Sequence, residues 1–365
     1  MSSVERPVRA QLADGRDIAY YALPGNTPRP VPDRRPLAPR PASAQSEVRY
    51  DAATGDWVAV AAHRQDRTYK PPADQCPLCP SPTGETSEVP AADYDVVVFE
   101  NRFPSLSHAG EGAEPIPAGA LSAPGVGRCE VICFSSDHTT SFAELTHEHA
   151  RLVVDVWRDR TRAMFAMTGV EQVFCFENRG EEIGVTLTHP HGQIYGYPYL
   201  TPRTATMLRQ AESYAAEHDG ANLFADIVSR ELRDGVRVIA RTHDWTAFVP
   251  FAARWPVEVH IYPNRRVLNL LELTDDELDG FTDIYVDVLG RFDHMYPTAL
   301  PYISALHQYR PDRGQEQGYF HVELMSIRRS ATKLKYLAGS ESGMDAFITD
   351  VTPEQTAERL KALSS

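Results

Sequence analysis

The sequence predicts an α+β fold with a largely antiparallel sheet flanked by helices. Two observations support this fold class: strand-like segments outnumber amphipathic helical segments, and one strand–connection–helix pattern occurs twice. Glu130-Val131 and Glu144-Leu145-Thr146 match Glu258-Val259 and Glu272-Leu273-Thr274, each 128 positions later. The 365 residues suffice for one large or two ordinary domains, so a duplicated unit fits the length.

Each expected element follows from a local pattern. Alternating or short apolar runs rich in β-branched and aromatic residues predict strands at 95–99, 130–134, 172–176, 236–240, 247–251, 257–262 and 319–325. Amphipathic periodicity predicts helices at 147–168, 275–293 and 353–363, and the last two follow the capping boxes Thr274-x-x-Glu277 and Thr352-x-x-Gln355. The Pro- and Arg-rich stretch 22–45 predicts an extended arm, and 104–128 a long loop.

Composition excludes several classes of protein. Apolar residues make up 42% and charged residues 24%, which is typical of a globular chain. No run of about 18 apolar residues could span a bilayer, and no apolar segment near the N-terminus predicts secretion, so we expect a cytoplasmic protein. The net charge of −14 argues against a nonspecific nucleic-acid binder. Five cysteines without an export signal indicate thiols or metal ligands rather than a disulfide scaffold.

Cys76-Pro-Leu-Cys79 is a CxxC pair within a Pro-rich turn. Two thiolates at this spacing can chelate one soft cation such as zinc. A redox pair and two ordinary thiols are the alternatives, although the surrounding prolines disfavour the helix that a thioredoxin-type motif requires. Zinc needs two further ligands, for which His189 and His138 are candidates, and spacing alone does not select His138.

The segment His189-Pro190-His191-Gly192-Gln193 carries the strongest chemical signal. If it is a strand, the two histidines and the glutamine share one face, and Pro190 and Gly192 favour a sheet edge or a bend. A neutral imidazole can attack an activated phosphoryl centre, and a glutamine amide can donate to a non-bridging oxygen. The alternative is a structural histidine pair in a turn. The second copy of the repeat has only Phe320-His321-Val322-Glu323, so we expect the first half to carry the reaction.

These motifs resemble those of the galactose-1-phosphate uridylyltransferase family, the transferase branch of the histidine-triad superfamily. The resemblance rests on HPHGQ, the preceding FENRG, and CPLC and CFSSDH upstream, and it covers about residues 46–363. It implies two histidine-triad-like halves, which we place at 46–210, with the zinc site and nucleophile, and 211–365, with a hexose-contacting segment, after an arm at 1–45. It also implies a homodimer whose active sites borrow residues across the interface.

The resemblance implies a two-step exchange with UDP-glucose and galactose 1-phosphate as substrates. His191 would attack the α-phosphorus of UDP-glucose, glucose 1-phosphate would leave, and galactose 1-phosphate would then take the uridylyl group from the histidine. Gln193 would stabilise the transferring phosphoryl group. The family's structural zinc maps onto Cys76, Cys79, His138 and His189.

Further positions match substrate-contacting residues of the family. Arg64 and Arg67 match arginines near the diphosphate. Asn101 matches an asparagine near the nucleotide, but Arg102 stands where relatives usually have Asp. Asn178, Gly184 and Thr186 match a phosphate-contacting stretch, while Lys335, Tyr336 and Glu341 match the hexose-contacting segment, in which Ser340 is a departure.

A second metal site of some members, built from one Glu and three His, maps onto Met207, His307, His321 and Glu323. Met207 removes the carboxylate, although the other three residues could form a different metal site.

Two other functions stay open from the sequence. One is a related nucleotidyltransferase, such as an ADP-sugar or dinucleoside polyphosphate phosphorylase, which uses the same histidine with another base and acceptor. The other is a zinc-stabilised nucleotide-binding protein whose arm serves as a docking segment.

Overall fold

A computed structural model describes residues 6–66, 70–110 and 112–363. The chain divides into two compact units, here called the first and second unit. The first unit comprises 1–175, 186–209 and 309–316, and the second comprises 176–185, 210–308 and 317–365. No helix among the described residues is long and apolar enough to cross a membrane.

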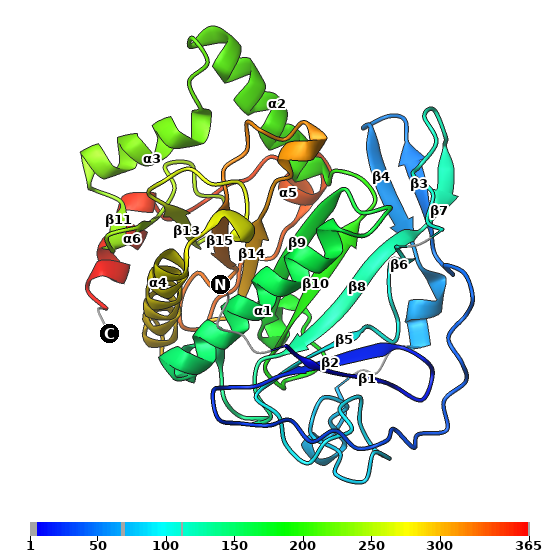
Figure 1. The fold of residues 1–365 in the computed structure, drawn as a ribbon. Helices are drawn as coiled ribbons and strands as arrows, with labels where there is room; N and C mark the ends of the chain where they lie inside the picture. The colour runs from blue at the N-terminus through cyan, green and yellow to red at the C-terminus, as the bar shows by residue number, and fades with distance from the viewer. Residues whose placement is uncertain (1–5, 67–69, 111, 364–365) are drawn as a thin grey trace. The chain divides into compact units, whose positions relative to one another are not determined.

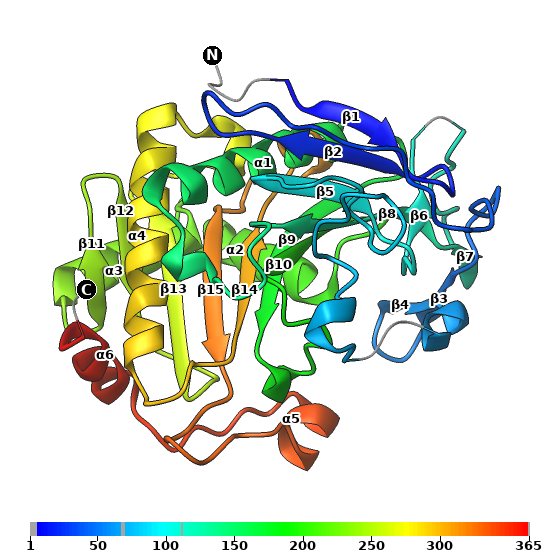
Figure 2. The same ribbon diagram turned by 90° about the horizontal axis from the view of Figure 1, so that it is seen from below.

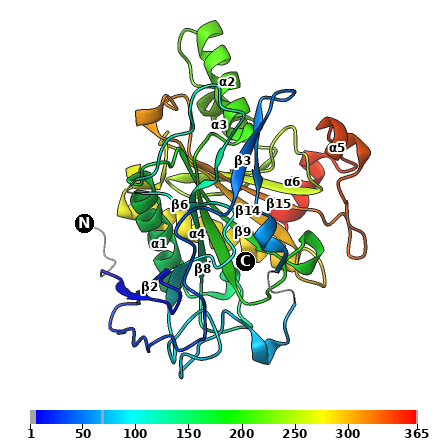
Figure 3. The same ribbon diagram turned by 90° about the vertical axis from the view of Figure 1, so that its right-hand side faces the viewer.

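The first unit is built on an antiparallel run of strands in the order β1-β2-β5-β8-β10 (Figure 1). Its strands are β1 (Val8–Gln11), β2 (Asp17–Tyr21), β5 (Val96–Glu100), β8 (Val126–Cys133) and β10 (His191–Tyr197). Helix α1 (His147–Phe165) packs on β10, and β6 (Ser107–His108) pairs in parallel with β8. A small antiparallel sheet contains β3 (Glu47–Asp51), β4 (Asp56–Val60) and β7 (Ser122–Pro124), and Figure 3 shows β3 as the blue strand that faces the viewer.

The second unit has its own antiparallel strands in the order β14-β15-β13-β12-β11. They are β14 (Tyr302–His307), β15 (His321–Ser326), β13 (Val257–Pro263), β12 (Trp245–Phe248) and β11 (Val238–Arg241). Helix α4 (Asp275–His294) runs along them (Figure 2). Also present are α3 (Leu223–Asp234), α5 (Gly339–Met344) and α6 (Pro353–Lys361), while β9 (Gln172–Arg179) and α2 (Pro202–Glu217) contribute residues to both units.

The α+β class and the internal repeat are confirmed. In each unit a strand, β8 or β13, leads through a short 3-10 turn, Phe142–Glu144 or Leu270–Glu272, into a long helix, α1 or α4. The turns and the helix starts are separated by the same 128 positions as the sequence matches. Thr146 and Thr274 cap the two helices, accepting hydrogen bonds from His149 N and Glu277 N.

Several sequence expectations are wrong in detail. The expected loop 104–128 contains β6 and β7 and the start of β8. Four strands before residue 61, strand β14 and helices α2, α3 and α5 were not predicted. The arm at 22–45 is extended, as expected, with one isolated bridge between Pro30 and Ala91.

The position of the HPHGQ segment is a further correction. It does not lie at a sheet edge, because β10 runs between β8 and β9. The strand begins at His191, so Pro190 lies before the ladder and its missing N–H removes no strand hydrogen bond. His189 therefore does not share the strand face of His191 and Gln193.

Candidate active site and metal centre

His191 and Gln193 lie two residues apart on β10, so their side chains point to the same side of the sheet. Both line a pocket of about 150 Å³ in the first unit. The pairing of β10 with β8 fixes their positions along the sheet: His191 lies opposite Cys133, and Gln193 lies opposite Val131. The other lining residues are Arg64, Pro77, Leu78, Glu88, Phe99, Asn101, Arg102, Phe103, Val131, Thr186 and Leu187.

The His191 ring is prepared to act as a nucleophile. Its Nδ1 lies 2.7 Å from the His189 carbonyl oxygen, which can only accept, so Nδ1 carries the proton and Nε2 has a free lone pair. Burial lowers the pKa of His191 below its usual value, and the hydrogen bond to His189 opposes this only in part. The imidazole is therefore neutral at pH 7, which is the nucleophilic form.

Tyr195, two residues further along β10, fixes the orientation of Gln193. The Tyr195 hydroxyl donates to Gln193 Oε1 at 2.9 Å, which leaves the amide N–H₂ of Gln193 as a donor. The tyrosine is buried, and it also interacts with Arg64 and Ser105. Sequence analysis missed Tyr195, although its place at the next same-face position of the strand is a signal that could have found it.

The predicted zinc ligands come together in the first unit. The ligand atoms of Cys76, Cys79, His138 and His189 all lie within 4.8 Å of one another. Cys79 Sγ is 3.3 Å from His138 Nδ1 and 3.5 Å from His189 Nδ1. Zinc–ligand bonds of about 2.0–2.3 Å in a tetrahedron require spacings of about 3.3–3.8 Å, so two thiols and two imidazoles here fit zinc.

The outer contacts of the cluster also fit a metal centre. His189 Nε2 lies 2.8 Å from both the Ser135 carbonyl oxygen and the Tyr94 hydroxyl, and His138 Nε2 lies 3.0 Å from Thr188 Oγ1. Such partners orient metal-binding imidazoles so that the opposite nitrogen faces the ion. Burial and the nearby Cys76 raise the pKa of Cys79 to about 12 without a cation, and a divalent cation would instead stabilise the thiolates.

The His191 pocket also contains three other predicted substrate residues of the first unit: Arg64, Asn101 and Thr186. Arg64 donates to Ser105 Oγ, and Asn101 Oδ1 accepts from the Phe103 amide at 2.9 Å. Arg67 lies outside the described residues.

The remaining predicted substrate residues belong to the second unit. Asn178 is on β9, and Gly184, at φ +89°, ends a 3-10 turn in the left-handed conformation. Lys335 and Glu341 are buried together, with Lys335 Nζ 3.3 Å from Glu341 Oε1 and also bonded to the Ile348 carbonyl oxygen. Tyr336 does not join them, because 68% of its surface is exposed.

A second cluster in the same unit contains His307, His321 and Glu323, with ligand atoms within 4.8 Å. Glu323 lies 3.4 Å from His307 Nε2 and 3.7 Å from His321 Nε2. His260 on β13, which sequence analysis missed, lies 3.6 Å from Glu323. Burial would raise the pKa of Glu323, but His307 and His260 outweigh it and hold that pKa well below its usual value. Met207 belongs to the first unit.

Two family models together match most of the chain. The model described as galactose-1-phosphate uridyl transferase, N-terminal domain, matches residues 36–201. The model of the C-terminal domain of the same transferase matches residues 207–365.

Individual proteins agree with these matches. A galactose-1-phosphate uridylyltransferase of Streptomyces lividans is 46% identical, with 97% of each chain covered, and one of Thermotoga maritima is 34% identical over 86% of this chain and 98% of the relative. A solved uridylyltransferase structure superposes with a TM-score of 0.75 at 31% identity, covering 87% of this chain and 98% of the other. An ADP-glucose phosphorylase of Arabidopsis thaliana shares the fold, with a TM-score of 0.67 at 20% identity, 88% coverage of this chain and 100% of the other.

Proposed function

Because the chain belongs to the galactose-1-phosphate uridyl transferase family, we propose that His191 is the nucleophile with which it moves UMP from UDP-glucose to galactose 1-phosphate. The protein is a nucleotidyltransferase of galactose metabolism, and its products are UDP-galactose and glucose 1-phosphate. The observation that carries the role of His191 is its ring: neutral, with Nδ1–H donated to the His189 carbonyl and Nε2 available in the pocket. A related nucleotidyl transfer has less support, because the likeness to the ADP-glucose phosphorylase extends to the fold alone.

In the first step Nε2 of His191 forms a bond to the α-phosphorus of UDP-glucose, and the bond from that phosphorus to the glucose 1-phosphate oxygen breaks. The ring becomes cationic while Nδ1 keeps its proton, and the His189 carbonyl stabilises that charge. The amide of Gln193, oriented by Tyr195, donates to a non-bridging oxygen as negative charge develops. Arg64 supplies a further positive charge at the phosphates.

In the second step a phosphate oxygen of galactose 1-phosphate attacks the same phosphorus. The bond to His191 breaks, and the neutral imidazole returns. The attacking oxygen is already anionic near neutral pH, so the step needs no dedicated base. Asn101 is assigned to the nucleotide of the donor, and Arg67, Asn178, Gly184 and Thr186 are assigned to its phosphates.

Zinc is assigned to Cys76, Cys79, His138 and His189, where it would cross-link the chain. Four protein ligands leave no position for substrate, so its part is structural. His189 is both a metal ligand and the residue whose carbonyl holds His191, so a metal there would fix the backbone that presents the nucleophile. The cluster of His260, His307, His321 and Glu323 is kept as a candidate for a second ion.

The hexose-contacting role is assigned to Lys335, Tyr336 and Glu341. We place the enzyme in the cytoplasm as a homodimer, in which this segment completes the site of the neighbouring chain. The domain boundaries at residues 45 and 210 also stay a proposal.

The test is the covalent intermediate. The purified protein is incubated with UDP-glucose alone, quenched, and weighed intact by mass spectrometry. One added uridylyl group, absent from His191→Ala and discharged by galactose 1-phosphate to UDP-galactose, is the expected result. Turnover that survives in His191→Ala would refute the assigned nucleophile, and an adduct formed from ADP-glucose but not UDP-glucose would refute the donor.

A further inference from the structure

We propose that Glu88 accepts a hydrogen bond from a ribose hydroxyl of the donor nucleotide, and that the N-terminal arm positions it through Arg35. This inference rests on the proposed function, since it concerns the same pocket. It gives the arm a part in donor selection instead of a docking role. The sequence analysis assigned no role to Glu88 or to Arg35 itself.

Glu88 lies in the wall of the pocket that holds His191 and Gln193. Only 7% of the residue is exposed. Its amide donates to the Pro77 carbonyl at 2.8 Å, and Ser87 Oγ donates to the Cys79 carbonyl at 2.5 Å. The segment is thus fastened to the loop of the predicted zinc site, so the carboxylate has a fixed place in the wall.

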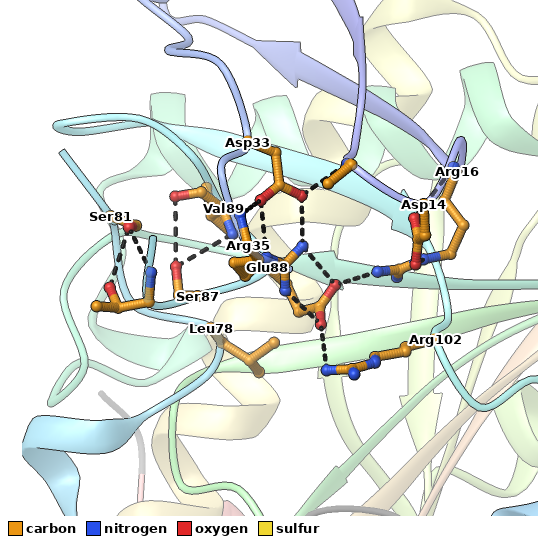
Figure 4. A network of polar contacts seen from close by, with 12 residues as sticks. Asp14, Arg16, Asp33, Arg35, Leu78, Ser81, Ser87, Glu88, Val89 and Arg102 are labelled. Carbon is orange, nitrogen blue, oxygen red and sulfur yellow. Dashed lines mark hydrogen bonds and ion pairs between the residues drawn. The ribbon is translucent and has the colours of Figure 1, made fainter. Parts of the chain in front are cut away.

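Three arginines surround this carboxylate (Figure 4). Arg16 Nη2 lies 2.6 Å from Oε2, Arg35 Nη1 lies 2.7 Å from Oε1, and Arg102 Nη1 lies 3.8 Å from Oε1. A carboxylate can accept about four hydrogen bonds, so it has capacity left for a hydroxyl donor. The guanidinium groups also offset the repulsion between Glu88 and the phosphates of a bound donor.

Arg35 is held in place by the arm itself. Asp33 accepts from Arg35 Nε at 2.9 Å and from the Ala13 amide at 2.9 Å. Burial would raise the pKa of Asp33, but the hydrogen bonds from Arg35 and Ala13 outweigh it and lower that pKa, so the aspartate stays ionised. Because Asp33 holds the guanidinium group of Arg35, Arg35 contacts Glu88 in a fixed orientation.

The arm is also seated against the rest of the unit by its backbone. Val31 N donates to the Pro90 carbonyl at 2.8 Å, and Arg34 N donates to the Gly84 carbonyl at 2.7 Å. Gly84 has φ +74°, and a Cβ there would lie 2.1 Å from the Pro32 carbonyl oxygen, so no other residue permits this close approach. A fixed arm is what a positioning role for Arg35 requires.

The chemistry of the pocket favours ribose as the partner of Glu88. His191, Gln193, Arg64 and Thr186 mark its phosphate end, and the other polar side chains in its wall are those of Asn101, Arg102 and Glu88. The pocket volume of about 150 Å³ is small compared with the roughly 300–1,000 Å³ of sites for drug-sized ligands. A pocket of this size holds only the groups next to the α-phosphate, and the ribose is the sugar joined directly to that phosphate. Carboxylates accept ribose hydroxyls in other nucleotide sites for the same reason: a vicinal diol offers donors to a fixed acceptor.

The experiment compares kcat/KM for UDP-glucose with that for its 2′-deoxy and 3′-deoxy analogues. We expect wild-type protein to disfavour at least one analogue by about ten- to a hundredfold, the effect of one hydrogen bond to a charged group. In Glu88→Gln the amide oxygen can still accept but carries no charge, so kcat/KM should fall for UDP-glucose more than for the deoxy analogues, and the preference should shrink. Arg35→Ala should reduce the preference in the same direction, whereas Arg34→Ala, whose side chain is exposed on the same arm, should keep it.

If wild-type protein uses both deoxy analogues with the same kcat/KM as UDP-glucose, the proposal is overturned, and no variant is needed for that conclusion. An unchanged preference in folded Glu88→Gln would overturn the role of Glu88. If that variant does not fold, Arg35→Ala decides, and an unchanged preference there overturns the role of the arm. Failure of wild-type protein to form any uridylyl adduct would instead refute the proposed function.

Discussion

At the level of single residues, Gln193 and Tyr195 should make two separable contributions to catalysis. Gln193 donates a hydrogen bond to the phosphoryl oxygen, and Tyr195 orients the amide that donates it. Gln193→Ala removes the donor to the phosphoryl oxygen, and we expect kcat to fall about 10²–10³-fold. Tyr195→Phe leaves the amide in place but frees its orientation, so a smaller loss of about tenfold is expected. Single-turnover formation of the uridylyl adduct measures both. Equal losses in the two variants would contradict the division of roles.

Glu177 gives a second prediction at this scale. Burial raises its pKa to about 7 from its ordinary 4.5, against the opposing effects of the Tyr302 hydroxyl at 2.9 Å and of Arg179; Asp293 adds to the rise, and Tyr285 also faces it. The folded protein thus binds a proton that the unfolded chain releases, so wild-type stability should fall as pH rises from 4.5 to about 7.

Glu177→Gln resembles the protonated acid and should remove this pH dependence. Urea unfolding at pH 5 and pH 8 measures it, with Glu217→Gln on the exposed face of α2 as the control. A wild-type protein that is no less stable at pH 8 than the Glu177→Gln variant would contradict the buried-acid assignment.

At the scale of the element, Thr274 is the N-cap of α4 and forms a capping box with Glu277. Thr274→Ala leaves the Glu277 amide without its acceptor and should cost about 1 kcal/mol of stability. Thr274→Ser keeps the oxygen and should stay within a few tenths of wild type. Denaturant midpoints at an unchanged m-value measure the difference, and a neutral Thr274→Ala would mean that packing alone sets the start of the helix.

The loop around the cysteine pair gives a prediction about metal removal. We expect one zinc per chain in the wild-type protein and none in Cys76→Ser. The variant should also melt at a lower temperature and form the uridylyl adduct more slowly, because the metal no longer supports the backbone from His189 to His191. Cys175→Ser is the matched control, since that buried cysteine lies outside the cluster. Elemental analysis without zinc, combined with unchanged melting of Cys76→Ser, would refute the assignment.

At the scale of the whole molecule, the proposed dimer with shared sites can be tested by complementation. His191→Ala and Lys335→Ala should each be inactive alone. If the nucleophile and the hexose segment of one site come from different chains, unfolding and refolding the two variants together should restore part of the activity, because mixed dimers contain one intact site. A refolded mixture that stays inactive, beside wild type that recovers, would refute shared sites.

Features that depend on neighbouring residues could be predicted from the sequence. The strand segments around 95–99, 130–134, 172–176 and 257–262, the helices with their threonine caps, and the duplication all follow from periodicity and capping, which act within a few residues. The same holds for the motif residues of the nucleophile and the cysteine pair, although their assignment as ligands and catalysts drew on family likeness. Shorter or irregular strands such as β1, β2 and β6 were missed because their pairing, not their pattern, makes them strands.

The distant residues that complete these sites could not be predicted in this way, because the packing of the whole chain brings them together. This packing turned His189 toward the cysteines rather than along the face of β10, since the strand begins two residues later. It brought Tyr94 to His189, His260 to Glu323, and Arg35 to Glu88, pairs separated by 53 or more positions. No local pattern encodes such pairs, because each contact depends on how strands and loops far apart in the chain pack together.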